Sequence, residues 1–269
     1  MPIPSDTIDK LEQTYRSISA LGAQLDESDW ELPTELPGWT VKDNLSHLIG
    51  TERSLQGLPP ADHTPGETPH VKNPIGQFNE REVDARRSRS GAEVLAEWDE
   101  LVDQRIATLR GADESYYAAE TMTPTGPGSV ADFLHIRILD LWSHEQDIRR
   151  AVGKPGGFDD GSAAHTIDRL VRTLPIVIGK RARTPEGAAV RFDITGPVSR
   201  SLTYEVRGGR ASQVEAAESE PVASVSMDSE TFAVLALGRR QASEVGDRVR
   251  IAGDAQLGQR IVENLAMMI

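Results

Sequence analysis

The chain has no cysteine among its 269 residues. This absence excludes disulfide bonds, thiolate metal ligands and a cysteine nucleophile, so any thiol chemistry would need a thiol from outside the protein. The sequence also has no run approaching the roughly 18 apolar residues that span a bilayer. Its N-terminal segment, MPIPSDTIDKLEQTYRS, has no apolar signal core. We therefore expect a cytoplasmic protein.

Positive charge is scarce. The sequence has 29 Lys and Arg against 42 Asp and Glu, which gives a net charge of −13 and an isoelectric point near 5.0. General binding to nucleic acid or to anionic membranes needs a basic surface, so we expect neither kind of partner. Phosphate-binding loops of the GxxxxGK[ST] or GxGxxG type and a GxSxG nucleophile elbow are also missing from the sequence.

The first half of the chain is predicted to be helical. Apolar residues recur at helical spacing, and most of the predicted helices start near a Ser or Thr that can cap them. Thr40-x-x-Asp43 approximates a capping box, with Asp in place of Glu. We expect a long loop from Gly57 to Pro74 and a turn-rich connection over 113–128. The predicted helices are 6–25, 40–55, 78–87, 90–109 and 129–152.

The pattern changes after Gly153. A helix over 162–174 is followed by alternating apolar residues typical of strands at 190–194, 202–206 and 222–227, with Gly208-Gly209 as a turn. Further on we expect a helix from Ser229, a short strand at 249–251 and a last helix from Asp254 that includes Met268. The sequence therefore predicts a helical domain over 1–153, a bridging helix and linker over 154–187, and a smaller α+β domain over 188–269.

Three side chains are candidate metal ligands. Asp140 and His144 are four residues apart and share one face of a helix that is apolar nearly all round. A carboxylate buried there costs several kcal/mol unless it is paired, neutralised or bound to a cation. His47 lies beside the apolar face of another predicted helix, and facing helices commonly supply ligands to one site. Two imidazoles and a carboxylate can hold a divalent ion and leave one position open.

Simpler interpretations of these residues stay open. An Asp–His pair at this spacing is most often a hydrogen bond, and a histidine beside an apolar face is usually part of the core. Asp147 could orient a metal ligand from behind or belong to a solvated face. Arg239 and Arg240 could contact an anionic substrate or complement the dipole at a helix end. His63 and His70, in the long loop, are expected to be solvated.

Two segments carry a resemblance to a known family. PGWTVKDNLSHLIGTERS and RILDLWSHEQDIRRAVG resemble the mycothiol-dependent maleylpyruvate isomerase family, a branch of the DinB-like metalloproteins. The region from about Ala188 to Ile269, with VSMDSETFAVLALGRR and VRIAGDAQLGQRIVENLA, is similar to that family's C-terminal domain, which is related to the sterol carrier proteins.

This resemblance implies a DinB-like four-helix bundle followed by a small α+β, sterol-carrier-protein-like domain. It implies a divalent metal, typically zinc, on His47, Asp140 and His144. The family's isomerase has glutamate where this chain has Asp140, and aspartate is one methylene shorter. Direct ligation would therefore need a closer backbone approach or a bridging water.

The resemblance also implies thiol-dependent chemistry on a small electrophile. Mycothiol would be deprotonated at the metal and would add to the substrate, which then isomerises or leaves as a thiol adduct. The substrate pocket would lie in the cleft between the two domains, with Trp142 as a possible lining residue and core packing as its alternative role. We expect a monomer or homodimer. Two other functions stay open, a non-catalytic small-ligand carrier with a structural metal and a metal-dependent hydrolase that needs no thiol.

Overall fold

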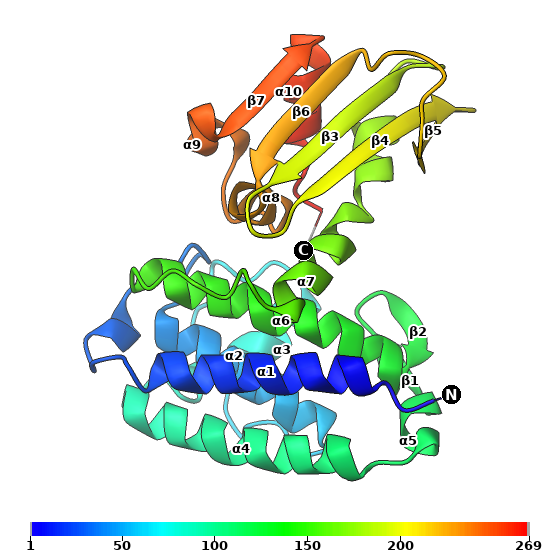
Figure 1. Cartoon of the computed structure of the whole chain (residues 1–269). Helices are drawn as coiled ribbons and strands as arrows, with labels where there is room; N and C mark the ends of the chain where they lie inside the picture. The colour runs from blue at the N-terminus through cyan, green and yellow to red at the C-terminus, as the bar shows by residue number, and fades with distance from the viewer. Residues whose placement is uncertain (1, 268–269) are drawn as a thin grey trace. The chain divides into compact units, whose positions relative to one another are not determined.

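The computed structural model describes residues 2–267, so Met268 of the last predicted helix lies outside the described residues. The chain divides into two compact units, residues 1–157 and 158–269. Helix α7 (Gly161–Val171), which we expected to be a bridge, is part of the second unit. The first unit is mainly helical and the second has a mixed sheet with helices (Figure 1). This confirms the α plus α+β fold class.

Four long helices form the first unit: α1 (Ser5–Gly22), α2 (Val41–Leu55), α4 (Gly91–Gly111) and α6 (Val130–Ala151). Helix α1 packs on α4 and α6, and α2 also packs on α4 and α6, which makes a four-helix bundle (Figure 1). Helix α3 (Pro74–Asp84) lies against α2. A 3₁₀ turn, η1 (Asp29–Glu31), precedes α2.

The connection over 113–128 is more regular than we predicted. It contains a short helix, α5 (Glu114–Ala118), and an antiparallel hairpin of β1 (Glu120–Thr123) and β2 (Gly126–Ser129). The Pro and Gly residues of this segment indicated turns, and the short strands have little hydrophobic alternation that would reveal them.

Side-chain caps fix where most helices of the bundle begin. Thr40, Ser90 and Ser129 each form a capping box with the acidic residue three positions later, so the predicted starts of α2, α4 and α6 are confirmed. The predicted cap of α1 is wrong. Ser5 is already inside the helix, and the residue before it, Pro4, offers no side-chain hydrogen bond.

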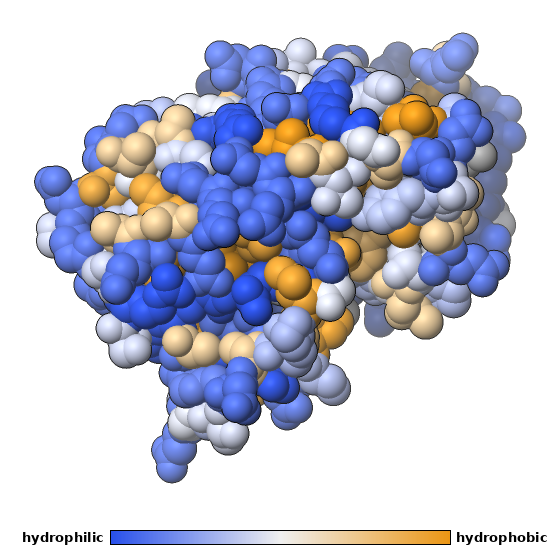
Figure 2. All heavy atoms as spheres, turned by 90° about the horizontal axis from the view of Figure 1, so that it is seen from below, coloured by the Kyte–Doolittle hydropathy of each residue, from blue (hydrophilic) through white to orange (hydrophobic). Residues whose placement is uncertain are grey.

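One face of the molecule is mostly hydrophilic (Figure 2). On the face shown in Figure 2, hydrophobic side chains are scattered among polar ones. No helix within residues 2–267 combines the length and the apolar character needed to cross a bilayer.

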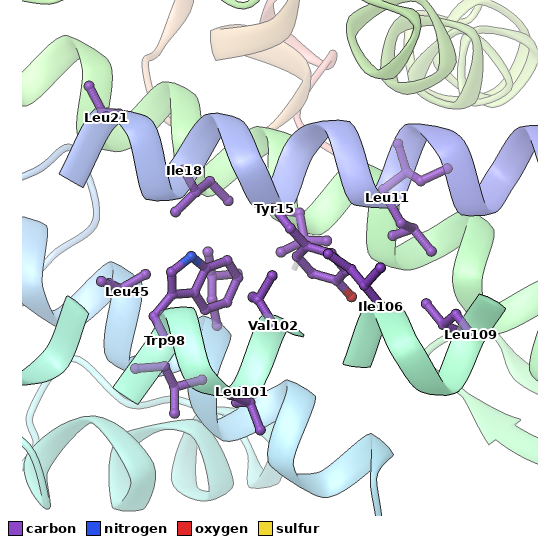
Figure 3. Packing of buried hydrophobic residues seen from close by; sticks show 14 of the residues in the cluster. Leu11, Tyr15, Ile18, Leu21, Leu45, Trp98, Leu101, Val102, Ile106 and Leu109 are labelled. Carbon is purple, nitrogen blue, oxygen red and sulfur yellow. The ribbon is translucent and has the colours of Figure 1, made fainter. Parts of the chain in front are cut away.

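The core of the bundle is built on the contact between α1 and α4 (Figure 3). Tyr15 and Trp98 are fully buried, and their rings meet edge to face with centroids 5.7 Å apart. Aliphatic side chains surround this aromatic pair, among them Leu11, Ile18, Leu45, Val102 and Ile106. This core holds α2 and α6 in a fixed relation, which matters because both carry candidate ligands.

The second unit contains a five-stranded sheet with the order β5-β4-β3-β6-β7. All neighbouring strands are antiparallel except β3 and β6. The predicted apolar alternations on the central strands are confirmed as buried side chains. Strand β5 was not predicted, because Ala211 is its one fully buried residue. The strands are β3 (Ala189–Thr195), β4 (Arg200–Arg207), β5 (Arg210–Val214), β6 (Ala223–Asp228) and β7 (Val249–Gly253).

Helices pack on this sheet. Helix α8 (Ser229–Ala236) contacts β3 and β6, α10 (Ala255–Glu263) contacts β6 and β7, and a π-helical turn η2 (Ile176–Arg181) contacts β5. The remaining elements are short, α9 (Ala242–Val245) and η3 (Gly246–Arg248). Gly208 and Gly209 join β4 to β5 with φ of 59° and 71°, conformations that glycine adopts without strain, so the predicted turn is confirmed.

Candidate metal centre

The fold brings the three candidate ligands together. His47 lies on α2, Asp140 and His144 lie on α6, and the two helices pack side by side. Both histidines are buried, whereas the Asp140 side chain is 31% exposed to solvent. One donor atom from each residue lies within 4.8 Å of the others. The centre is therefore enclosed by protein on most sides and reachable from the side of the carboxylate.

The separations suit a shared cation better than direct hydrogen bonds. His47 Nε2 is 3.5 Å from Asp140 Oδ2, and His144 Nε2 is 3.6 Å from Asp140 Oδ1. Hydrogen bonds between such groups are usually about 2.7–3.2 Å long. Two ligands of a tetrahedral zinc ion, each about 2.0–2.1 Å from the metal, lie roughly 3.3 Å apart. The donor set of this chain thus fits a small divalent ion.

Asn44 fixes the tautomer of His144. The Asn44 amide nitrogen donates to Thr34 Oγ1 at 3.1 Å and to the Thr40 carbonyl at 2.9 Å, which leaves its Oδ1 as an acceptor. His144 Nδ1 lies 2.8 Å from that oxygen and must donate its proton to it. The lone pair of neutral His144 is then on Nε2, the nitrogen that faces the centre.

The two imidazoles differ in their protonation. Burial lowers the pKa of His144, but Asp140 and Asp147 outweigh it, so the pKa ends above the ordinary value. Asp147 Oδ2 lies 3.5 Å from His144 Nδ1, and Arg150 holds its other oxygen at 2.6 Å. Burial lowers the pKa of His47, and the Asp140 carboxylate offsets only part of this. His47 is therefore the more readily neutral ligand.

A buried ion-pair network supports the carboxylate. Arg137 donates to Asp140 Oδ2 and, at 2.9–3.0 Å, to Glu52 Oε1. Arg105 Nε lies 3.2 Å from Glu52 Oε2. Burial alone would raise the pKa of Asp140, but Arg137 and the two histidines hold it well below the ordinary range. Asp140 is thus ionised at neutral pH, as a metal ligand must be.

Trp39 forms a wall beside both imidazoles. Its ring centroid is 5.3 Å from that of His47 and 6.0 Å from that of His144. Its indole nitrogen donates to Glu80 Oε2 at 3.0 Å, and this buried carboxylate also binds His70 at 2.9 Å and Arg87 at 2.7 Å. The indole is therefore held in place at the edge of the centre.

The expectation that His63 and His70 are solvated is wrong for His70, whereas His63 keeps 36% of its side chain exposed although it too has a partner. His63 Nε2 lies 2.6 Å from Asp84 Oδ2, and His70 is paired with Glu80, so both imidazoles attach the loop after α2 to helix α3. Local sequence could not reveal this, because the partners are 10 and 21 residues away.

Comparison with known proteins agrees with this arrangement. Residues 11–149 match the family described as the mycothiol maleylpyruvate isomerase N-terminal domain, and residues 178–266 match the SCP-2 sterol transfer family. The chain belongs to the mycothiol maleylpyruvate isomerase family. All three candidate ligands lie within residues 11–149, the part of the chain that matches the family's N-terminal domain.

Solved structures and curated relatives cover nearly the whole chain. The crystal structure of the mycothiol-dependent maleylpyruvate isomerase superposes with a TM-score of 0.59 at 17% identity, over 94% of this chain and 93% of that one. A structure of a histidine-to-alanine mutant of that enzyme gives 0.56 at the same identity and coverage. Two Mycobacterium tuberculosis proteins, the uncharacterized proteins MT0041 and Rv0036c, are each 24% identical over 99% of this chain and 97% of theirs.

The other predicted site residues lie in different surroundings. Trp142 is fully buried, and its indole nitrogen donates to the Gly157 carbonyl at 2.7 Å. These contacts favour a role in core packing. Arg239 and Arg240 follow α8 in the second unit and are half-buried, and Arg239 donates to the Leu237 carbonyl at 3.1 Å. Asp147 lies on the Nδ1 side of His144, away from the centre, which is the position of a residue that orients a metal ligand.

Sequence reasoning did not identify Trp39, Asn44 or Arg137 as partners of the three candidate ligands. Two of them carried a usable signal. Asn44 is three residues before His47 and shares its helix face, and Arg137 is three residues before Asp140 in a mostly apolar stretch of its helix. Trp39 precedes the helix, and its position depends on Glu80, so spacing alone could not place it.

Proposed function

We propose that the chain is a metal- and mycothiol-dependent enzyme, an isomerase or S-transferase that acts on a small electrophile, with zinc on His47, Asp140 and His144. The convergence of two imidazole nitrogens and an ionised carboxylate from α2 and α6 carries this proposal. Membership of the family supports the thiol, and the lack of cysteine agrees with a thiol that comes from outside the chain.

A zinc ion bound here would supply one thing, a lowered pKa for a thiol at its open position. The protein side chains do the rest. Asn44 holds the proton on Nδ1 of His144, so that Nε2 stays available as a ligand. Arg137 fixes one oxygen of Asp140 and leaves the other free, which favours ligation through a single oxygen.

The surroundings of the centre select what can approach it. Trp39 presents a flat apolar surface beside the two imidazoles and excludes water from that side. Arg137 adds a buried positive charge next to Asp140, and Glu52 balances it. A planar, conjugated electrophile would pack on the indole, which is consistent with a substrate that carries an activated double bond.

A two-step experiment tests this function. Protein without a polyhistidine tag is analysed for metal and then assayed for cis–trans isomerisation of maleylpyruvate, with and without mycothiol. We expect about one zinc per chain and turnover only with the thiol. His47→Ala and His144→Ala should lose metal and turnover together, whereas His63→Ala, outside the centre, should keep both.

Three outcomes separate the possible functions. Metal-dependent turnover without any thiol would replace the proposal by hydrolase chemistry. Bound metal with adduct formation instead of isomerisation would identify a transferase. Metal content below about 0.1 per chain, unchanged by the histidine substitutions, would overturn the proposal.

A further inference from the structure

A buried polar layer crosses the hydrophobic core of the bundle. Each of the four long helices contributes one residue to it, Tyr15 on α1, Glu52 on α2, Arg105 on α4 and Arg137 on α6. All four residues are at most 2% exposed. Burying charged groups is costly unless they are paired, and apolar side chains of similar size commonly replace such pairs without loss of stability. Stability alone is therefore a weak reason for charge in this layer.

Glu52 connects this layer, because it holds arginines from two other helices. Its Oε1 accepts hydrogen bonds from Nε and Nη2 of Arg137, at 3.0 Å and 2.9 Å. Its Oε2 lies 3.2 Å from Nε of Arg105, and Nη1 of Arg105 in turn donates to the Tyr116 hydroxyl at 2.9 Å. The two arginines and Glu52 leave one positive charge, which the carboxylate of Asp140 balances.

The contact between Glu52 and Arg137 determines how Arg137 meets the metal ligand. With Nε and Nη2 directed to Glu52, it is Nη1 that donates to Asp140 Oδ2. The other carboxylate oxygen, Oδ1, lies 3.6 Å from His144 Nε2, a separation that suits a shared ion. A guanidinium with a free edge favours two parallel hydrogen bonds to both oxygens of a carboxylate. Such a pair would engage Oδ1 as well as Oδ2.

We propose that Glu52 is a positioning residue for the metal centre. It keeps the donors of Arg137 away from Asp140 Oδ1, so this oxygen stays available to a divalent ion. Its negative charge also offsets the charge of Arg137, a cation that would otherwise repel the ion at short range. Glu52 acts on the centre through Arg137. This role rests on the proposed metal binding, but it does not depend on the thiol or on the substrate.

The zinc affinity of the full chain, measured by competition with a chromophoric chelator, tests this role. Glu52→Gln keeps the size of the side chain and removes its charge, and we expect zinc to bind about 10- to 100-fold more weakly. The double variant Glu52→Gln/Arg137→Gln also removes the guanidinium that is no longer held. It should bind zinc about tenfold more tightly than Glu52→Gln, because substitutions of contacting residues are not additive. General loosening of the core would instead make the double variant the weaker binder.

Two further variants separate positioning from damage to the core. Tyr116→Phe removes a hydrogen bond of Arg105 without touching Arg137, and it should leave zinc affinity unchanged. Glu52→Asp keeps the charge on a shorter side chain, and it carries the test if thermal unfolding shows that Glu52→Gln does not fold. We expect Glu52→Asp to weaken zinc binding about three- to tenfold, less than the usual loss of a complete partner.

The outcomes distinguish this role from the metal site itself. Absence of zinc binding by the unmodified chain would overturn both proposals. Unchanged zinc affinity in the folded Glu52 variants, equal weakening by Tyr116→Phe, or a double variant that binds zinc more weakly than Glu52→Gln would overturn the role of Glu52 alone.

Discussion

Asn44 is the residue that decides how His144 presents its ring to the metal centre. Its amide group is oriented by Thr34 and Thr40, and it accepts the Nδ1 proton of His144. His47 lacks such a partner, because within residues 2–267 its buried Nδ1 makes no hydrogen bond. One imidazole is thus preorganised by its neighbours and the other is not.

Removing this orienting contact should weaken metal binding. We expect Asn44→Ala to lower zinc affinity about 10- to 100-fold, the usual cost of losing a partner behind a metal ligand. Competition titration against a chromophoric chelator measures this. Ser54→Ala, an exposed position on the same helix, should leave the affinity unchanged. Equal affinities for both variants would show that Asn44 does not orient His144.

The raised pKa of His144 predicts how metal binding depends on pH. A proton on this imidazole competes with the metal ion. As the pH is lowered, the metal affinity should therefore start to decrease at a pH above 6.5, the ordinary pKa of histidine being about 6.5, and it should decrease further at lower pH. Asp147→Asn removes one cause of the raised pKa. The onset of the loss should then move to lower pH, as zinc titrations from pH 8 to pH 5.5 would reveal. An unchanged onset would contradict this role of Asp147.

At the scale of elements, α2 and α3 approach each other through a glycine. A Cβ added to Gly50 would lie 2.5 Å from the Cβ of Glu82, closer than real contacts allow. Gly111, at the end of α4, has open space at the same position. The small residue on α2 therefore allows α3 to lie against the helix that carries His47.

These two glycines make a matched pair of substitutions. Gly50→Ala should destabilise the protein by about 1–3 kcal/mol, because the helices must separate. Gly111→Ala should be neutral or stabilise it by up to about 1 kcal/mol, because alanine favours the helix. Urea denaturation measures both. A stabilising effect at Gly50 would mean that the two helices are not in tight contact.

Helix α3 is also tied to Trp39 and to the loop through Glu80. Burial raises the pKa of Glu80, but His70, Trp39 and Arg87 outweigh it and leave the pKa below the ordinary value. A depressed pKa means that the stabilisation is fully present above about pH 4.5 and is lost as pH falls through the folded-state pKa.

Glu80→Gln should therefore lower the free energy of unfolding by about 1–3 kcal/mol at pH 7. The difference from the unmodified protein should stay constant down to about pH 5 and shrink below that. Glu67→Gln, an exposed position in the loop, should have no effect at either pH. A difference that grows on acidification would contradict the assigned direction of the pKa.

The sequence predicted elements that carry a strong local pattern. Three helix starts followed from capping residues, and the central strands followed from apolar alternation. Strand β5 and the β1–β2 hairpin lacked that alternation and were missed. The three donor residues were predictable because Asp140 and His144 are one turn apart on a buried helix. The orientation of Asn44 and Arg137 depends on residues from other elements, such as Thr34 and Glu52, which spacing alone cannot show.

At the scale of the whole molecule, the chain has two units, and the candidate metal centre lies in the first. Zinc bound there would stabilise the folded state by mass action, so its binding can be followed by thermal unfolding.

X-ray absorption at the zinc edge of the loaded protein tests the metal centre most directly. We predict two imidazole rings and one carboxylate oxygen at about 2.0–2.1 Å, and a new sulfur neighbour at about 2.3 Å when mycothiol is added. A spectrum with fewer than two imidazoles, or one that shows no sulfur at saturating thiol, would contradict the account.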